Sequence, residues 1–159
     1  MFLAKEYSMC KGVGISDKKL PSFDKALLKA GVGNYNLVRL SSILPAKCKF
    51  VNLSDIKTHI KEGSLLPIAY STISSDTLGD KLISTIGVGI PEDEENVGVI
   101  MEYSTKNVSV KEALNTLEEM IEEAFEERGW KLKEKQIIYA EAIVSKNATY
   151  TTFAGIPEW

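Results

Sequence analysis

The chain has little cysteine, a single histidine and no long apolar run. Its two cysteines, Cys10 and Cys48, show neither CxxC spacing nor a secreted disulfide pattern, which indicates structural thiols in a reducing cytoplasm. His59 lies among Lys57, Thr58 and Lys61, a setting typical of a solvated surface residue, so we assign it neither a metal nor a catalytic role. No segment approaches the roughly 18 apolar residues of a membrane span, and the N-terminus becomes charged too early for a signal peptide.

The chain also lacks an excess of basic charge. It has 19 Lys and Arg residues against 22 Asp and Glu residues, a net charge of −3 and a pI near 5.3. Without a basic stripe, neither nucleic acid nor another anionic partner is expected. A length of 159 residues with 44% hydrophobic residues predicts one domain, residues 1–159, with a core of its own.

Apolar and β-branched residues recur between turn signals along most of the chain. Strands are predicted over 3–14, 36–45, 47–53, 65–75, 81–90, 97–103, 136–145 and 149–154, with the run 36–45 interpreted as a buried strand. Gly12 and Gly14 permit a turn or a close backbone approach, and a turn is favoured because no phosphate-loop pattern follows. Most of the predicted strands follow one another without a helix between them. This pattern predicts an α+β fold with mainly antiparallel sheets.

Two helices are predicted. For residues 110–128, Ser109 and Glu112 form a capping box, Gly129 ends the helix, and one apolar stripe faces a sheet. A shorter helix over 23–30 has Ser22 as its N-cap and Gly31 after its last turn. Asp24 then lies in its first turn, either as an acid favoured by the helix dipole or as a carboxylate that binds a substrate.

A serine pair, Ser41 and Ser42, ends the run 36–45 between Leu40 and Ile43, where hydroxyl groups need partners. Each serine is therefore either hydrogen-bonded or reactive. The serine pair belongs to an ordered set of segments, 23–28, 30–39, 41–45, 66–70, 87–91 and 98–103. In this order the set resembles the pyruvoyl-dependent arginine decarboxylase family.

The resemblance implies that the chain cuts itself. The Ser42 hydroxyl attacks the carbonyl of Ser41, the peptide becomes an ester, and elimination leaves chains 1–41 and 42–159. Residue 42 then hydrolyses to a covalent pyruvoyl group, the electron sink that decarboxylation requires, with no pyridoxal phosphate and no metal. A fold that strains or aligns the junction would assist the attack. The family also implies a four-layer αββα sandwich assembled as a homotrimer, possibly as a dimer of trimers, with sites between subunits.

The resemblance also implies the residues of the site. Glu102 matches the catalytic acid, whose apolar strand would raise its pKa, although a strand acid can equally face outward. Asn36 matches a residue of the processing and substrate site, but it is also an ordinary turn residue. Asp24 matches the carboxylate that meets the guanidinium group. The apolar pocket positions, which can equally be core residues, are Leu20, Leu27 and Ile43.

The expected reaction is decarboxylation of L-arginine to agmatine and CO2 for polyamine synthesis. One alternative is a related pyruvoyl decarboxylase for another amino acid, and Asp24 discriminates between the two. A second alternative, from another class, is an unprocessed paralogue that binds a cationic amine without turnover.

Overall fold

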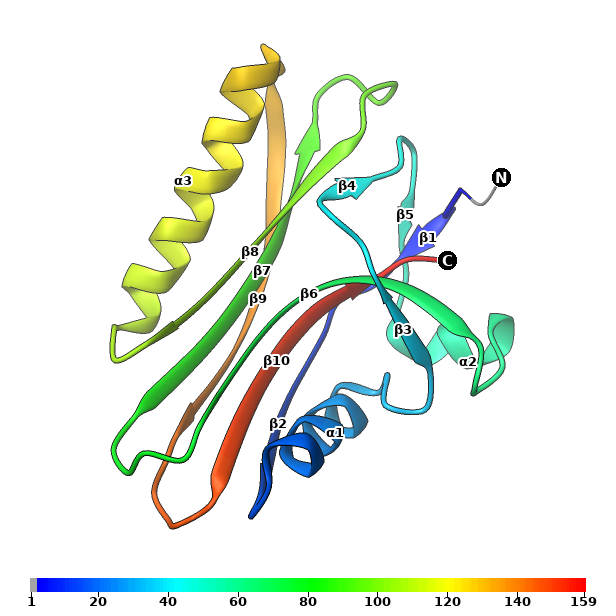
Figure 1. Ribbon diagram of the computed structural model, residues 1–159. Helices are drawn as coiled ribbons and strands as arrows, with labels where there is room; N and C mark the ends of the chain where they lie inside the picture. The colour runs from blue at the N-terminus through cyan, green and yellow to red at the C-terminus, as the bar shows by residue number, and fades with distance from the viewer. Residues whose placement is uncertain (1–2) are drawn as a thin grey trace.

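The computed structural model describes residues 3–159 as two four-stranded sheets with helices against them (Figure 1). The elements in chain order are β1 (Glu6–Tyr7), β2 (Cys10–Ser16), α1 (Lys19–Ala30), β3 (Asn36–Arg39), β4 (Ile43–Leu44), β5 (Lys49–Phe50), the 3-10 turn η1 (Leu53–Asp55), α2 (Ile56–His59), β6 (Leu65–Ser75), β7 (Lys81–Pro91), β8 (Gly98–Lys106), α3 (Val110–Arg128), β9 (Leu132–Ile143) and β10 (Thr149–Pro157).

The strand orders are β2-β10-β6-β3 in the first sheet and β4-β8-β7-β9 in the second, and β1 pairs with β5 in a small separate sheet. All pairs are antiparallel except β3 with β6 and β1 with β5. The predicted α+β class with mainly antiparallel sheets is therefore confirmed.

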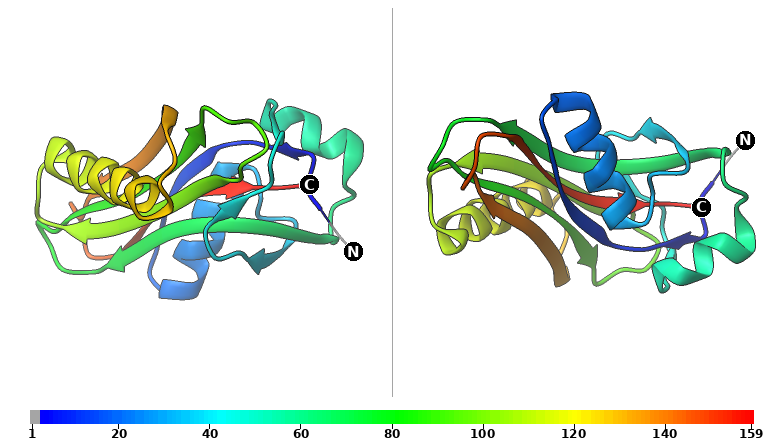
Figure 2. Two further views of the ribbon diagram at one scale, coloured as in Figure 1. Left: turned by 90° about the horizontal axis from the view of Figure 1, so that it is seen from above. Right: turned by 90° about the horizontal axis from the view of Figure 1, so that it is seen from below.

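The two sheets face each other, and each carries a helix on its other face (Figures 1 and 2). α1 packs on β2 and β10, whereas α3 packs on β7 and β8. Apolar side chains fill the space under each helix, for example Phe153 under α1 and Ile121 in α3. Between the sheets, Ile86, Ile100 and Ile156 belong to a further apolar cluster. These contacts hold the facing surfaces of β6 and β8 together, and the candidate site lies there.

The run 36–45 is not one buried strand. It divides into β3 and β4, which belong to different sheets, and β3 is an edge strand in which Val38 is 42% exposed. The predicted strand 47–53 is also wrong except for β5, and the following polar segment contains η1 and α2. The strands β3, β4 and β5 are short because each belongs to a different sheet, and the chain must cross from one sheet to the next after each of them.

The start of α1 also differs from the prediction. The helix begins at Lys19, so Ser22 lies inside it, where its Oγ donates to the carbonyl of Lys19 (2.7 Å) and contacts Thr151 Oγ1 (2.6 Å). Asp24 consequently lies beyond the first turn. Gly31 does end the helix, with φ of 82°.

Gly12 and Gly14 lie within β2, not in a turn, because the helix α1 crosses directly over them. A Cβ atom at Gly12 would lie 2.2 Å from the carbonyl oxygen of Ala26, and one at Gly14 would lie 1.8 Å from that of Ser22. Only glycine permits this close packing of helix on strand.

α3 agrees with the prediction at both ends. The Ser109 Oγ accepts a hydrogen bond from the Glu112 N–H (3.1 Å), and Gly129 closes the helix in the left-handed conformation. No helix within residues 3–159 combines the length and the apolar character that crossing a bilayer would demand.

The C-terminal segment buries a carboxyl group. Glu158 is 3% exposed, and its Oε1 has no hydrogen-bond partner within residues 3–159. This burial raises the pKa of Glu158 from 4.5 to about 7. Between these two pH values the folded chain holds a proton that the unfolded chain has lost, so stability falls as the pH rises through this window.

We therefore expect Glu158→Gln to change the free energy of unfolding little at pH 5 and to raise it by roughly 1 to 3 kcal/mol at pH 8. At pH 8 the wild-type carboxyl group is ionised although it is buried, and glutamine removes this charge. Urea unfolding at the two pH values measures this difference. Glu119→Gln, on the exposed face of α3, is the matched control and should show no such pH dependence. Equal effects of Glu158→Gln at both pH values would contradict the assignment.

Candidate active site

The serine pair lies where the chain passes from one sheet to the other. Before the pair, the Leu40 N–H donates to the carbonyl of Ile68 in β6 (3.0 Å), which belongs to the first sheet. After it, the carbonyl of Ser42 accepts a hydrogen bond from the Ile100 N–H in β8 (2.8 Å), which belongs to the second sheet. Figure 1 shows this crossing between β3 and β4. The Ser41–Ser42 peptide is thus held from both sides by different sheets.

Neither serine has the positive φ that would indicate backbone strain; among the non-glycine residues of 3–159, only Lys47 and Asn107 do. Ser41 is exposed and Ser42 is half-buried. The crossing therefore supplies alignment by two anchored ends, without a left-handed backbone conformation at either serine.

Glu102 lies two residues from Ile100 along β8, in the strand that pairs with β4. Ile100 binds the carbonyl of Ser42, so Glu102 lies diagonally across from Ser42. Residues in this diagonal relation on neighbouring antiparallel strands are about 7 to 8 Å apart, a distance that a long side chain can span. Glu102 lines a pocket of about 130 Å³, whose other walls are Arg39, Ser71, Thr72, Tyr103 and Ser104. The pocket thus combines residues of β6 and β8 with the end of β3.

Arg39 is the charge partner of Glu102. Its guanidinium group pairs with Glu102 Oε1, lies 4.7 Å from the centre of the Tyr70 ring, and donates to the Tyr70 carbonyl (3.3 Å). The Glu102 side chain is 33% exposed, so its surroundings are less apolar than its strand neighbours predicted. Its second oxygen, Oε2, is buried without a hydrogen-bond partner within residues 3–159.

Sequence reasoning did not assign a role to Arg39 or Ser71. The one signal for Arg39 was a charged residue within an apolar run, three positions before Ser42. For Ser71, whose Oγ is also buried without a partner in the described chain, no sequence signal existed.

The other predicted residues do not line this pocket. Asn36 lies at the far end of β3, where its Nδ2 donates to the carbonyl of Gly63 (2.6 Å). Asp24 and Leu20 are exposed on α1, Leu20 by 75%, whereas Leu27 packs into the core below the helix. Ile43 pairs with Val99 and is 40% exposed. One chain thus brings Ser42, Ile43 and Glu102 to adjacent strands but leaves the α1 residues on the opposite face of the first sheet.

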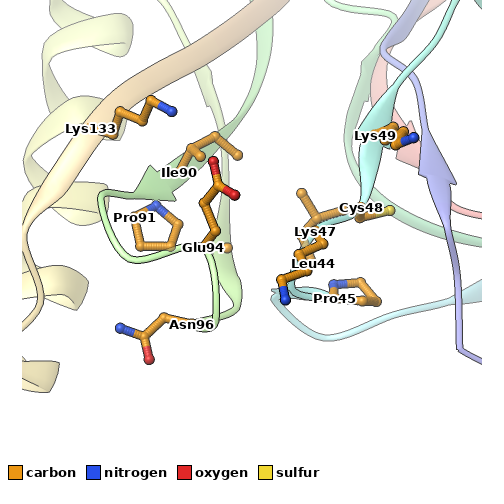
Figure 3. Close-up of a pocket in the computed structure, with 11 residues that line it drawn as sticks. Leu44, Pro45, Lys47, Cys48, Lys49, Ile90, Pro91, Glu94, Asn96 and Lys133 are labelled. Atoms are coloured by element: carbon orange, nitrogen blue, oxygen red, sulfur yellow. The ribbon is translucent and has the colours of Figure 1, made fainter.

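A larger cavity of about 450 Å³ lies between the segment that joins β4 to β5 and the ends of β7 and β9 (Figure 3). Leu44 and Cys48 form one wall and face Ile90, Pro91 and Lys133 across it. None of the predicted site residues lines this cavity, so it adds nothing to the candidate site.

The fold and the site together define a small α+β protein with a serine pair at a crossing between sheets and a carboxyl group beside it. A family model described as pyruvoyl-dependent arginine decarboxylase matches residues 6–155. The chain belongs to this family.

Curated relatives extend the match. A pyruvoyl-dependent arginine decarboxylase of Pyrococcus abyssi is 44% identical over 126 residues, which cover 79% of this chain and 77% of the relative. The proteins of the same description from Methanocaldococcus jannaschii and Methanococcus aeolicus are 41% and 38% identical over 144 and 152 residues. These alignments cover 91% and 96% of this chain, and 84% and 88% of the relatives.

The residues present fit the covalent pyruvoyl group that the family implies. The chain has a serine pair at the crossing between the sheets, and the carbonyl of Ser42 accepts a hydrogen bond from the Ile100 N–H. The unpartnered Oε2 of Glu102 in the adjacent pocket is a buried polar atom of the kind that a reacting group would satisfy.

Proposed function

We propose that this chain decarboxylates L-arginine to agmatine and CO2. It does so as a single domain, in the cytoplasm, and as a step of polyamine synthesis. The observation that carries the proposal is the serine pair held between two sheets, with Ile100 and Glu102 on the strand beside it. Family membership supports the substrate, and two free cysteines, Cys10 and Cys48, fit a reducing compartment.

The chain first cuts itself at the crossing. The Ser42 Oγ attacks the carbonyl carbon of Ser41, and its proton passes to the nitrogen of residue 42 as the peptide becomes an ester. Elimination breaks the ester bond and releases chain 1–41 with a free carboxylate. Water then replaces the nitrogen of residue 42, ammonia leaves, and chain 42–159 begins with a pyruvoyl group. The hydrogen bonds at Leu40 and Ser42 support this step because they hold both sides of the bond.

Once formed, the pyruvoyl group would supply the carbonyl that condenses with the substrate amine and the sink for the electron pair left on the α-carbon when CO2 departs. The Ile100 N–H donates to the amide carbonyl of residue 42, where negative charge develops, as an oxyanion donor does. Glu102 delivers a proton to the α-carbon after CO2 leaves. Asn36, at the far end of β3, positions substrate or precursor groups through its carboxamide.

Asp24 binds the guanidinium group of arginine, and Leu20, Leu27 and Ile43 contact its aliphatic part. Asp24 and Leu20 are exposed on α1, away from the pocket of Glu102. We therefore propose that the four-layer αββα domains assemble as homotrimers, possibly as a dimer of trimers, in which one subunit's α1 completes its neighbour's site. Exposed Leu20 and Val38 support such a contact.

Incubation of the purified protein with L-arginine tests the proposal, with agmatine and CO2 as products and intact mass under denaturing conditions as the second readout. Two fragments and agmatine are expected. Turnover of a different amino acid by a cleaved protein would favour the related decarboxylase. An uncleaved protein that binds agmatine without turnover would favour the non-catalytic paralogue.

Asp24→Asn should lower kcat/KM for arginine on the order of 10²-fold, because a charged partner of the guanidinium group is lost. The kcat/KM for citrulline, the neutral analogue of similar shape, should fall far less. The preference of the variant for arginine over citrulline should therefore be smaller than that of wild type. Asp17→Asn, an exposed acid just before α1, is the control and should leave the preference unchanged. An unaltered preference in Asp24→Asn would remove this residue from substrate recognition.

A further inference from the structure

Arg39 connects the two sheets beside the serine crossing. It ends β3 in the first sheet, and its guanidinium group lies over the ring of Tyr70 and donates to the Tyr70 carbonyl of the same sheet. The same group pairs with Glu102 on β8 of the second sheet. Stacking on an aromatic ring restricts a side chain that is otherwise half exposed. The position of the Glu102 carboxyl group is therefore set by a residue three positions before Ser42.

The two oxygens of Glu102 have different surroundings. Oε1 accepts from the Arg39 guanidinium group, whereas Oε2 is buried and has no partner among the described residues. A guanidinium group only donates hydrogen bonds, so the oxygen that it binds is poorly placed to carry a proton of its own. The proton of the acid form consequently belongs on Oε2.

We propose that Arg39 is a positioning residue for proton transfer. By binding Oε1, it fixes Oε2 as the oxygen that carries the proton and turns it toward the pocket between the sheets. This inference rests on the proposed function, in which Glu102 protonates the α-carbon. In this proposal Arg39 acts through its pair with Glu102.

The chemistry of arginine suits this task better than that of lysine. The planar guanidinium group can stack on Tyr70 while its edge faces both the Tyr70 carbonyl and the Glu102 carboxylate. An ammonium group supplies a charge but cannot combine these contacts in one plane. Lysine at position 39 should therefore restore only part of the function.

The experiment compares Arg39→Met and Arg39→Lys with wild type, with rates expressed per cleaved chain. Arg39→Met should lower kcat about 10- to 10²-fold, because moving a catalytic group by about 1 Å can reduce the rate by up to that factor. KM should stay within about twofold of the wild-type value. Arg39→Lys should lie between Arg39→Met and wild type. Arg128→Met is the matched control, because Arg128 also lies over an aromatic ring, that of Trp130, and donates to a carbonyl but has no carboxylate partner within residues 3–159.

A double-mutant cycle separates positioning from a structural role. In the Glu102→Gln background, Arg39→Met should lower kcat less than about twofold further, because the amide has no acidic proton to be positioned. A full additional loss in that background would overturn the proposal, as would near-normal kcat in cleaved Arg39→Met. If neither Arg39 variant is cleaved, Arg39 serves processing instead and the proposal is wrong. Wild-type protein that forms no agmatine would instead refute the proposed function.

Discussion

Replacing Ser42 by alanine is expected to leave one uncut chain that forms no measurable agmatine. The Ser42 hydroxyl belongs to the residue whose nitrogen is bonded to the carbonyl carbon of Ser41, and without it neither the ester nor the pyruvoyl group can form. Decarboxylation then has no electron sink, because no other residue set in the sequence supplies one. Intact mass under denaturing conditions and agmatine release measure the two losses separately.

Ser41→Ala is the matched control for this prediction. It removes a neighbouring hydroxyl but keeps both the nucleophile and the attacked carbonyl, so it should still be cleaved, though more slowly. In wild type, chain 42–159 should resist N-terminal sequencing and should be trapped by borohydride in the presence of an amine. Wild-type protein that stays one chain after long incubation yet decarboxylates arginine would refute the scheme.

Local signals predicted the parts of the fold that depend on local chemistry. α3 matches because Ser109 caps its first turn and Gly129 can adopt a positive φ, and both effects act within a few residues. The start of α1 was wrong because Ser22 finds its partners inside the fold, one of them Thr151 on a distant strand. Gly12 lies in a strand for a similar reason, since the helix that crosses it is a tertiary feature.

At the site, the crossing between the sheets also depends on tertiary contacts that the local sequence does not indicate. The apolar run 36–45 has the composition of a buried strand, and no periodicity within it indicates that it serves two sheets. The resemblance to the family named Ser42 and Glu102 as site residues but gave no role to Arg39. Arg39 and Glu102 are 63 positions apart, and their pairing depends on β3 ending where β8 passes. Such a contact follows from topology and not from sequence spacing.

Glu102→Gln should leave self-cleavage intact and lower kcat by about 10² to 10⁴-fold, the usual contribution of a general acid. Glutamine has nearly the shape of glutamate, and its carbonyl oxygen can still accept from Arg39, so the pocket between the sheets should keep its structure. The amide cannot release a proton to the α-carbon. Agmatine formation per cleaved chain, with cleavage quantified by intact mass, measures the effect.

Glu141→Gln provides the comparison, because Glu141 is a strand glutamate of the same sheet, paired with Lys81 and remote from the crossing. It should retain normal cleavage and turnover. If Glu102→Gln is fully cleaved and turns over at a near-normal rate, another group donates the proton and Glu102 has no catalytic role. If it fails to cleave, the carboxylate acts in processing at the adjacent Ser42. Only slow turnover by a fully cleaved chain assigns the acid to decarboxylation, because cleavage then proves that the crossing is intact and the lost step must follow it.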